Sequence, residues 1–200
     1  VSKLIFEDKK CVGVKFFKHG KEKFIKAAKE VILSGGAVNS PHILQVSGIG
    51  PSDHLMNIGI NVVHHLPGVG ANLQDHYVAR VSHRVRHAKS INSLSRGTNL
   101  LKEIATWAFS GKGALTFGVT SAMVFSRSRE GLSSPDLQLL FTPASYSERT
   151  LGKLEQEDGM TVAVCPVRPA SRGTIMAVSS DPFVRPEIRP NYLSDPDDVR

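Results

Sequence analysis

The sequence predicts an α+β fold, in which a first part of α/β type is followed by an antiparallel sheet that carries a helix. Three observations lead to this prediction. Residues 29–50 follow a strand–turn–helix pattern, short alternating strands lie on both sides of it, and the loop His64–His76 is rich in Pro and Gly. The loop is therefore the expected boundary between two domains.

The first 28 residues predict a β-meander. Strand-like residues occupy the start of the chain, the segment "VGVKFF" and residues 23–28, and turns are expected at Glu7–Lys10 and His19–Gly20. Residues 1–30 contain nine lysines and four acidic residues, and the lysines alternate with apolar residues. Lysines in this arrangement are typical of the exposed face of strands, where they also protect sheet edges.

The stretch "KEVILSGGAVNSPHILQVSGIG" (29–50) contains the most informative pattern. Glu30–Ser34 is a short, apolar, β-branched run, which predicts a strand that is covered on both faces. The tiny residues Gly35, Gly36 and Ala37 then allow a tight backbone and a close approach by another group. The pattern has two interpretations: tight packing of strand on helix, or a backbone surface for a ligand.

A helix is expected to follow this turn. Asn39 or Ser40 can act as its N-cap, and Pro41 suits the first turn, where a missing N–H costs little. Gly48 is placed to end the helix. At the other end, the positive N-terminus of the helix would favour an anionic or carbonyl-rich ligand. The expected buried stripe consists of Ile43, Leu44 and Val46.

The remaining elements alternate between short helices and strands. Ser52 is expected to cap a short helix that ends at Gly59, before a strand at Ile60–Val63. Residues Val78–Arg86 predict a half-buried strand, and Thr98–Phe109 an amphipathic helix. Later strands are expected at Thr120–Phe125, Pro135–Pro143, Met160–Pro169 and Gly173–Ser180.

Composition argues against several classes of protein. The 200 residues are 40% hydrophobic and 22% charged, as in ordinary globular domains, and no apolar run approaches the roughly 20 residues of a membrane span. Two distant cysteines form no disulfide framework and no metal spacing, which favours a reducing compartment. The net charge of +7 lacks the interleaved aromatic residues that stack on bases, so no nucleic-acid partner is predicted.

Both ends of the sequence resemble interrupted elements. The chain opens inside the strand-like run "VSKLIFE", and at its end Ser194 or Asp195 reads as the N-cap of a helix with Pro196 in its first turn. We therefore expect an interior segment of a longer protein.

The segment "GAVNSPHILQVSGIG" (36–50) matches every fixed position of the second signature of the glucose–methanol–choline (GMC) oxidoreductases. Other segments in the same order resemble this family too, among them "KEVILSGGA", "GPSDHLMNIGINVVHHLPGVGANLQDH" and "PASRGTIMAVSSDPFVRPEIRPNYLSDPDD". Together they span nearly the whole chain and are similar to the choline-dehydrogenase-like branch.

The resemblance implies FAD as cofactor and a partial GMC oxidoreductase fold. Residues 1–76 would form the central part of an FAD-binding domain, and residues 77–200 most of a substrate-binding domain. The implied reaction oxidises the CH–OH group of a small-molecule alcohol, choline-like or another primary alcohol, by hydride transfer to flavin. The implied cofactor-binding residues are Val1, Gly36, Ala37, Ser40 and Pro41.

Two features of the family are missing from the sequence. No segment satisfies the dinucleotide fingerprint Gly-x-Gly-x-x-Gly, because "GIGPSD", "GVGANL" and "GKGALT" each lack the third glycine. The resemblance places the catalytic His beyond Arg200, so no catalytic residue is expected in this chain, which alone would be inactive. The alternative is a non-catalytic scaffold or interaction domain derived from the family.

Several histidines invite other hypotheses. His64 and His65 are adjacent on or beside a strand, so they point to opposite faces and are poorly placed to share a metal; no metal site is predicted. His76 follows Asp75, which suggests either a contact with flavin or substrate or a hydrogen bond that fixes the loop. His42, at the start of the helix, is expected to be partly exposed.

Other candidate residues have mainly structural interpretations. Arg172 could capture an anion, but a turn with its guanidinium bonded to loop carbonyls is favoured. Trp107, Phe141 and Tyr146 could line a substrate cavity, although core positions are favoured. Ser121 and Ser147 lack the surroundings of a nucleophile, so hydrolase chemistry has no support.

Overall fold

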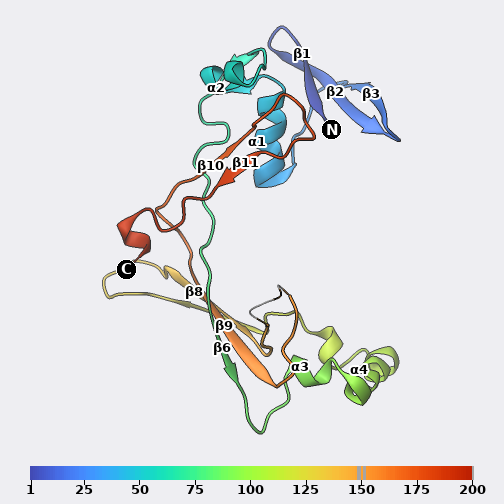
Figure 1. The fold of residues 1–200 in the computed structure, drawn as a ribbon, viewed down its shortest axis with the longest axis vertical. Coiled ribbons are helices and arrows are strands. Elements are labelled where there is room, and N and C mark those ends of the chain that lie inside the picture. Colours follow the sequence, from blue (N-terminus) through green and yellow to red (C-terminus); the bar gives the residue numbers. More distant parts are fainter. Residues whose placement is uncertain (148–149, 151, 200) are drawn as a thin grey trace. The chain divides into compact units, whose positions relative to one another are not determined.

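The structure is a computed structural model that describes residues 1–147, 150 and 152–199 (Figure 1). The chain divides into two compact units. The first consists of Val1–Asp75 together with Pro169–Arg200, and the second of His76–Arg168. Each unit is described by itself below.

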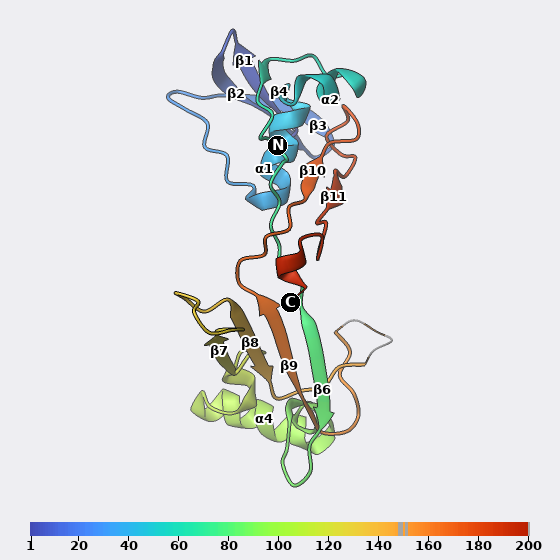
Figure 2. The ribbon, with the colours of Figure 1, turned by 90° about the vertical axis from the view of Figure 1, so that its left-hand side faces the viewer.

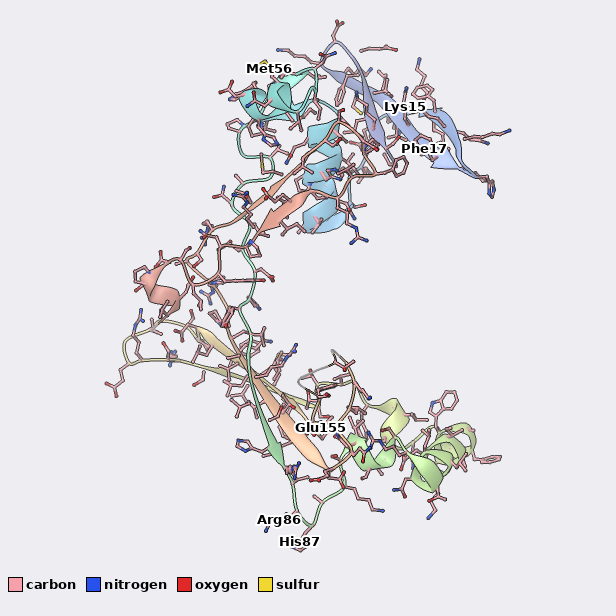
Figure 3. The ribbon with its side chains drawn as sticks, viewed as in Figure 1. Lys15, Phe17, Met56, Arg86, His87 and Glu155 are labelled. Carbon is pink, nitrogen blue, oxygen red and sulfur yellow. The ribbon has the colours of Figure 1, made fainter. Side chains whose placement is uncertain are left out.

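The first unit begins with the predicted β-meander. Strands β1 (Lys3–Glu7), β2 (Lys10–Lys18) and β3 (Lys21–Lys26) form an antiparallel sheet in this order. Both connecting turns lie where they were expected, and Asp8 and His19 have the positive φ angles that tight turns require. Figure 3 labels Lys15 and Phe17 on β2; the Lys15 ammonium lies 3.3 Å from the carboxylate of Glu22 on β3.

The predicted strand at Glu30–Ser34 is absent from the structure, so that prediction was wrong. Residues 27–35 have no regular structure, and Ile32 is 80% exposed. A strand exists only where neighbouring strands accept its backbone hydrogen bonds, and no strand in the described part of the chain pairs with this segment. The apolar sequence of residues 30–34 was therefore not sufficient to form a strand.

The predicted helix is present as α1 (Gly36–Val46), but it begins earlier than expected. Its N-cap is Gly35, so Pro41 lies inside the helix and not in its first turn. The side chain of Ser40, inside the helix, reaches back to the N-cap residue: its Oγ accepts the backbone N–H of Gly35 at 3.0 Å. As predicted, Gly48 follows the end of the helix with a positive φ of 92°.

The burial pattern of α1 also differs from the prediction. Val46 is buried, but the other buried side chains of the helix are His42 and Gln45, whereas Ile43 and Leu44 are half-buried. His42 was expected to be partly exposed; it is only 7% exposed, so that prediction was wrong. The face of α1 that contacts β1 and β10 is therefore more polar than the sequence suggested.

The segment after α1 forms a short parallel pair. Strand β4 (Ile49–Gly50) pairs with β5 (His64–His65), and α2 (Ser52–Asn57) lies between them in sequence. The strand predicted at Ile60–Val63 is wrong in position, since pairing starts only at His64, although Ile60 itself is buried. Pro51, not Ser52, is the N-cap of α2, and Figure 3 shows the exposed Met56 on this helix.

The C-terminal segment completes the first unit. Strands β10 (Thr174–Met176) and β11 (Glu187–Arg189) pair antiparallel, and Figure 1 shows them beside α1. The 3₁₀ helix η2 (Pro196–Asp198) follows the predicted cap Asp195, whose side chain accepts the N–H of Asp197 at 2.9 Å. The apolar core of the unit includes Leu4, Val12, Val46, Leu55, Ile60, Val69, Ile175 and Ala177.

The second unit is built on a four-stranded antiparallel sheet (Figure 2). Its strands are β6 (Ala79–Arg84), β7 (Ala122–Ser126), β8 (Leu137–Thr142) and β9 (Gly159–Pro166), in the spatial order β6–β9–β8–β7. Helices α3 (Ile91–Leu94) and α4 (Gly97–Ser110) contact each other, and the 3₁₀ helix η1 (Ala114–Thr116) contacts α4. Figure 3 labels Arg86 and His87 in the connection after β6.

Burial in the second unit is lower than expected. Every residue of β6 is exposed, so the prediction of a half-buried strand was wrong, and no residue of α4 is buried. Trp107 is 53% exposed, while Phe141 and Tyr146 are half-buried. The best-buried side chain of α3 is the polar Asn92, which is 0% exposed.

A polar network around Asn92 joins α3 to residues 145–158. Its amide donates to the carbonyl groups of Ser145 and Glu155 at 2.9 and 3.0 Å and accepts the N–H of Ser145 at 2.9 Å. Ser90, the N-cap of α3, donates from its N–H and its hydroxyl to Asp158. These bonds lower the pKa of Asp158 to about 2.

The two compact units differ from the predicted domains in one respect. The division falls at Asp75 and His76, close to the expected boundary at 76 and 77, but residues 169–200 pack with the first unit. The functional roles of the two predicted domains remain predictions.

Candidate functional site

The first unit contains a pocket of about 420 Å³ along one side of α1. Ligand pockets in proteins usually range from about 300 to 1,000 Å³. Four parts of the unit supply its wall: the two residues before β1, the irregular segment 32–35, α1 and Pro182. The lining residues are Val1, Ser2, Ile32, Leu33, Ser34, Gly35, Asn39, His42, Ile43, Val46 and Pro182. We call this the Ser2–His42 pocket.

Two of the lining residues, Ser2 and His42, each have a buried polar side-chain atom. Among the described residues, the Oγ of Ser2 and the Nε2 of His42 are the buried side-chain N and O atoms that have no hydrogen-bond partner. Ser2 is 5% and His42 is 7% exposed. Burial lowers the pKa of His42 below its usual value, so the imidazole is neutral at neutral pH.

The backbone around Ser2 is firmly held. Its N–H donates to the carbonyl of Lys15 on β2 at 2.8 Å. Two residues later, the N–H of Leu4 donates to Oγ of Ser47 at 2.8 Å. Ser47 is the residue that directly follows α1. The wall that contributes Ser2 is therefore tied both to the sheet and to the helix that carries His42.

The position of α1 is fixed by Gln45, which the sequence interpretation missed. Its side chain is 0% exposed; Oε1 accepts the N–H of Ala177 at 2.6 Å, and Nε2 donates to the carbonyl of Ile175 at 2.9 Å. Gly70 lies so close to Gln45 and to the Ile175 carbonyl that a Cβ there would overlap them. Three segments distant in sequence thus converge on one side chain.

The five residues predicted to bind a cofactor lie near the pocket to different degrees. Val1 lines it; Gly36, Ala37, Ser40 and Pro41 belong to the same end of α1 but are absent from the lining, where Gly35 and Asn39 take part. Gly36 has a φ of 78°, and a Cβ at this position would meet no atom within 4 Å. The turn geometry, not crowding, therefore requires glycine there.

The sequence analysis did not expect Ser2 and His42 to line a pocket. The spacing of His42, Gln45 and Val46 was the available signal, because side chains three and four positions apart share one helix face. A histidine on the same helix face as Val46 is a candidate for a buried position. The signal for Ser2 is only its position next to Val1.

The other histidine hypotheses resolve into structural contacts. His65 accepts the N–H of Ser52 through Nδ1 at 3.2 Å and so holds the first residue of α2. His76 donates from Nε2 to the carbonyl of Val167 at 3.1 Å, and Asp75 accepts a hydrogen bond from the hydroxyl of Tyr192. Both contacts hold the loop, and a contact of His76 with flavin or substrate stays a prediction.

Arg172 behaves as its favoured interpretation predicted. Its guanidinium donates to the carbonyl groups of Pro169, Ala170 and Ser171 at 2.7, 2.8 and 3.1 Å. The same turn is closed by Asp198, whose carboxylate accepts the N–H groups of Ala170 and Ser171, both at 2.7 Å. The hydrogen bonds from Ser171 lower the pKa of Asp198.

Within the part of the chain that the structure describes, no three His, Cys, Asp or Glu side chains gather in a way that could hold a metal ion. None of the helices described is both long enough and apolar enough to cross a bilayer.

The comparisons with known proteins agree with the signature. The family model "GMC oxidoreductase" matches residues 1–78. The human mitochondrial choline dehydrogenase is 38% identical over 205 residues, which cover 100% of this chain and 33% of that protein. An oxygen-dependent choline dehydrogenase of Staphylococcus saprophyticus is 40% identical over 200 residues, covering 100% of this chain and 35% of the other.

Solved structures of flavin enzymes resemble the fold of this chain. A formate oxidase from Aspergillus oryzae, examined for modification of its FAD, superimposes with a TM-score of 0.87 at 26% identity, over 99% of this chain and 40% of that one. This chain spans about a third of the length of the curated relatives it matches. The relatives are enzymes, so they give no support to the alternative of a non-catalytic scaffold.

The predicted α+β fold and the prediction of FAD as the cofactor of the family are both confirmed. The signature at residues 36–50, the match of the family model and the similarity along the whole chain lead to one conclusion. The chain belongs to the GMC oxidoreductase family.

Proposed function

We propose that this chain is part of an FAD-dependent enzyme that oxidises the CH–OH group of a small-molecule alcohol. The similarity to choline dehydrogenases over the complete chain carries this proposal. Choline or another primary alcohol is the proposed substrate. Bound FAD would supply the acceptor for the hydride that leaves the alcohol carbon.

The Ser2–His42 pocket is the proposed seat of one end of the FAD molecule. Apolar side chains such as Ile32, Ile43 and Val46 line it together with polar ones, which is the usual character of a small-molecule site. Val1, which lines it, and the α1 residues Gly36, Ala37, Ser40 and Pro41 are the proposed contact region. The residues present therefore fit an uncharged part of the cofactor.

Helix α1 contributes side chains to the wall of the pocket rather than the free N–H groups of its N-terminus. The N–H of Gly35 is already bonded to Ser40, and the pocket lies along the side of the helix, where Asn39, His42, Ile43 and Val46 line it. We therefore propose that the pocket accepts an uncharged part of the cofactor, and that a phosphate lies elsewhere.

The second unit is the proposed substrate-binding part. Its antiparallel sheet β6–β9–β8–β7 corresponds to the sheet expected over the substrate. We propose no catalytic base among residues 1–200, because the family resemblance places that histidine later in the protein. The 200-residue chain alone should then leave alcohols unchanged.

The test is to produce the longer protein that contains this chain and to record its absorption spectrum. The expected result is the yellow absorption of bound flavin, bleached anaerobically by choline or another primary alcohol. A colourless protein that takes up no added FAD would contradict the proposal. Bleaching by none of a panel of primary alcohols would contradict the substrate class and leave the cofactor intact.

A pair of glycine variants tests the proposed contact region. Gly36→Val places a β-branched residue at a φ of 78° beside the pocket, and Gly20→Val does the same at a φ of 73° in the β2–β3 turn. The strain in the backbone is matched, since neither position has a neighbouring atom within 4 Å. Loss of FAD from the first variant only is the expected result; equal retention would exclude this end of α1 as a contact.

A further inference from the structure

The sheet of the second unit contains no acidic residue. Strands β6, β7, β8 and β9 are described over their full length, and their permanently charged side chains are those of Arg80 and Arg84. Residues 76–168 as a whole contain twelve Lys and Arg against seven Asp and Glu, a net charge of +5. The proposed substrate-binding part is therefore positively charged, which favours anions and disfavours cations near the sheet.

The acidic residues within two positions of a strand already have partners. Asp136, directly before β8, accepts a serine N–H and a serine hydroxyl at 2.8 and 2.6 Å. Asp158, directly before β9, also accepts a serine N–H and hydroxyl at 2.8 and 2.6 Å, and Glu157 lies 2.7 Å from the guanidinium of Arg84. These three carboxylates satisfy protein groups, so they are poor counter-charges for a ligand.

The aromatic residues of the sheet are not arranged to hold a cation. A quaternary ammonium group donates no hydrogen bond, and aromatic cages are a common way for proteins to bind it. The four described strands contain two aromatic residues, Phe125 and Phe141. Phe141 pairs with Ala122, which is three positions before Phe125 on β7, so the two rings belong to opposite faces of the sheet.

Apolar side chains take the place of charges and cages. On one face of the sheet, two neighbouring rows of apolar residues cross all four strands. The rows consist of Val81, Val162, Phe141 and Ala122, and of Ala79, Val164, Leu139 and Val124. A trimethylammonium group against such a wall would lose hydration without compensation, whereas an uncharged tert-butyl group of the same shape would be stabilised there.

We propose that the substrate is a primary alcohol with an uncharged, apolar body, and that the enzyme discriminates against choline. The inference rests on the proposed function, because it takes the sheet β6–β9–β8–β7 to be a wall of the substrate site. It departs from the names of the choline dehydrogenases to which this chain is 38% and 40% identical. The charge of the sheet, rather than overall similarity, determines which alcohol fits.

The test compares choline with 3,3-dimethyl-1-butanol, in which a carbon atom replaces the nitrogen and removes the charge. Each alcohol is mixed anaerobically with the flavin-loaded longer protein, and the second-order rate constant of flavin reduction is measured. The uncharged alcohol should react at least about 100-fold faster, because a buried charge without a counter-charge is strongly disfavoured. A ratio of less than about tenfold, or a preference for choline, would overturn the inference.

Two neighbouring residues of β8 test whether the sheet is responsible. Leu139 and Leu140 are both half-buried and belong to opposite faces. Leu139→Glu and Leu140→Glu each add a carboxylate, and Leu139→Gln and Leu140→Gln are the uncharged controls. One of the Glu variants should shift the ratio of rates toward choline by at least about tenfold, while its Gln counterpart keeps the wild-type ratio. Folded Glu variants that both keep the wild-type ratio would overturn the inference; if neither folds, the wild-type ratio still decides it.

The outcomes separate the inference from the function. A flavin-loaded protein that is reduced by choline and not by uncharged primary alcohols would overturn the inference alone. A protein that binds no flavin, or whose flavin is reduced by no primary alcohol, would refute the proposed function.

Discussion

The side chain of Gln45 accepts the backbone N–H of Ala177 at 2.6 Å, across 132 positions of the sequence. The same amide donates to the carbonyl of Ile175, so one buried residue satisfies a donor and an acceptor of the segment that contains β10. This pair of bonds determines where α1 lies, and α1 carries His42. The geometry of the pocket therefore depends on a glutamine that does not line it.

Replacing Gln45 by Leu should destabilise the protein strongly. The change keeps the apolar volume but leaves the N–H of Ala177 and the carbonyl of Ile175 buried and unpaired, at a cost of about 2–5 kcal/mol. Chemical denaturation measures the free energy of unfolding. The control is Gln156→Leu, at an exposed position, with an expected change within about 0.5 kcal/mol. Similar losses in both variants would show that the bonds of Gln45 contribute little.

Gly70→Ala should be more damaging than an ordinary glycine substitution. Gly70 has a φ of 84°, and a Cβ there would overlap Gln45 and the carbonyl of Ile175. Backbone strain costs about 1–2 kcal/mol and overpacking adds about 1–3 kcal/mol. Gly20→Ala, at a φ of 73° with open space around it, isolates the first cost. A melting temperature lowered equally by both changes would contradict the close approach at Gly70.

Asp158 should make the second unit sensitive to acid. Its pKa is about 2 in the folded chain and near 3.9 when unfolded, so the folded state stabilises the ionised carboxylate. This stability is present above pH 4 and is lost as the pH falls toward 2. Asp158→Asn should flatten the dependence of unfolding free energy on pH in this range, whereas the exposed Glu130→Gln should preserve it. An unchanged slope in the first variant would refute the role of Asp158.

The two cysteines should differ in reactivity. Cys165, on β9, is 2% exposed, and burial raises the pKa of its thiol, while Cys11 is partly exposed. Iodoacetamide should therefore label Cys11 in the folded protein and Cys165 roughly tenfold more slowly, because the thiolate is the reactive form. Peptide mass analysis before and after denaturation gives both rates. Fast labelling of Cys165 under native conditions would show that β9 opens readily.

The sequence predicted best those elements that depend on neighbours close in the chain. The meander of residues 3–26 combines alternating side chains with turns at Asp8 and His19, and both signals are local. The helix at 97–110 likewise follows from its own periodicity. Such elements can be predicted because the residues that determine them lie within a few positions of each other.

Elements that depend on distant partners were predicted less well. Glu30–Ser34 has the composition of a buried strand, yet a strand also needs hydrogen-bonding neighbours, about which its own residues carry no information. The burial of His42 and Gln45 depends on contacts with segments far along the chain, among them residues 175–177. The signature at 36–50 identified the family, but the burial of the polar residues of α1 could be seen only when those contacts were known.

The discontinuity of the first unit has a consequence for biosynthesis. Residues 169–200 supply the backbone groups that Gln45 binds, and they are translated after the entire second unit. At about 5–20 residues per second, the meander and α1 must wait several seconds on the ribosome with the partners of Gln45 still missing. During this interval the second unit can fold as a contiguous piece, whereas the nascent N-terminal segment presents unpaired polar groups to chaperones. The hydrogen bonds between Gln45 and residues 175–177 are therefore among the last contacts of the first unit to form.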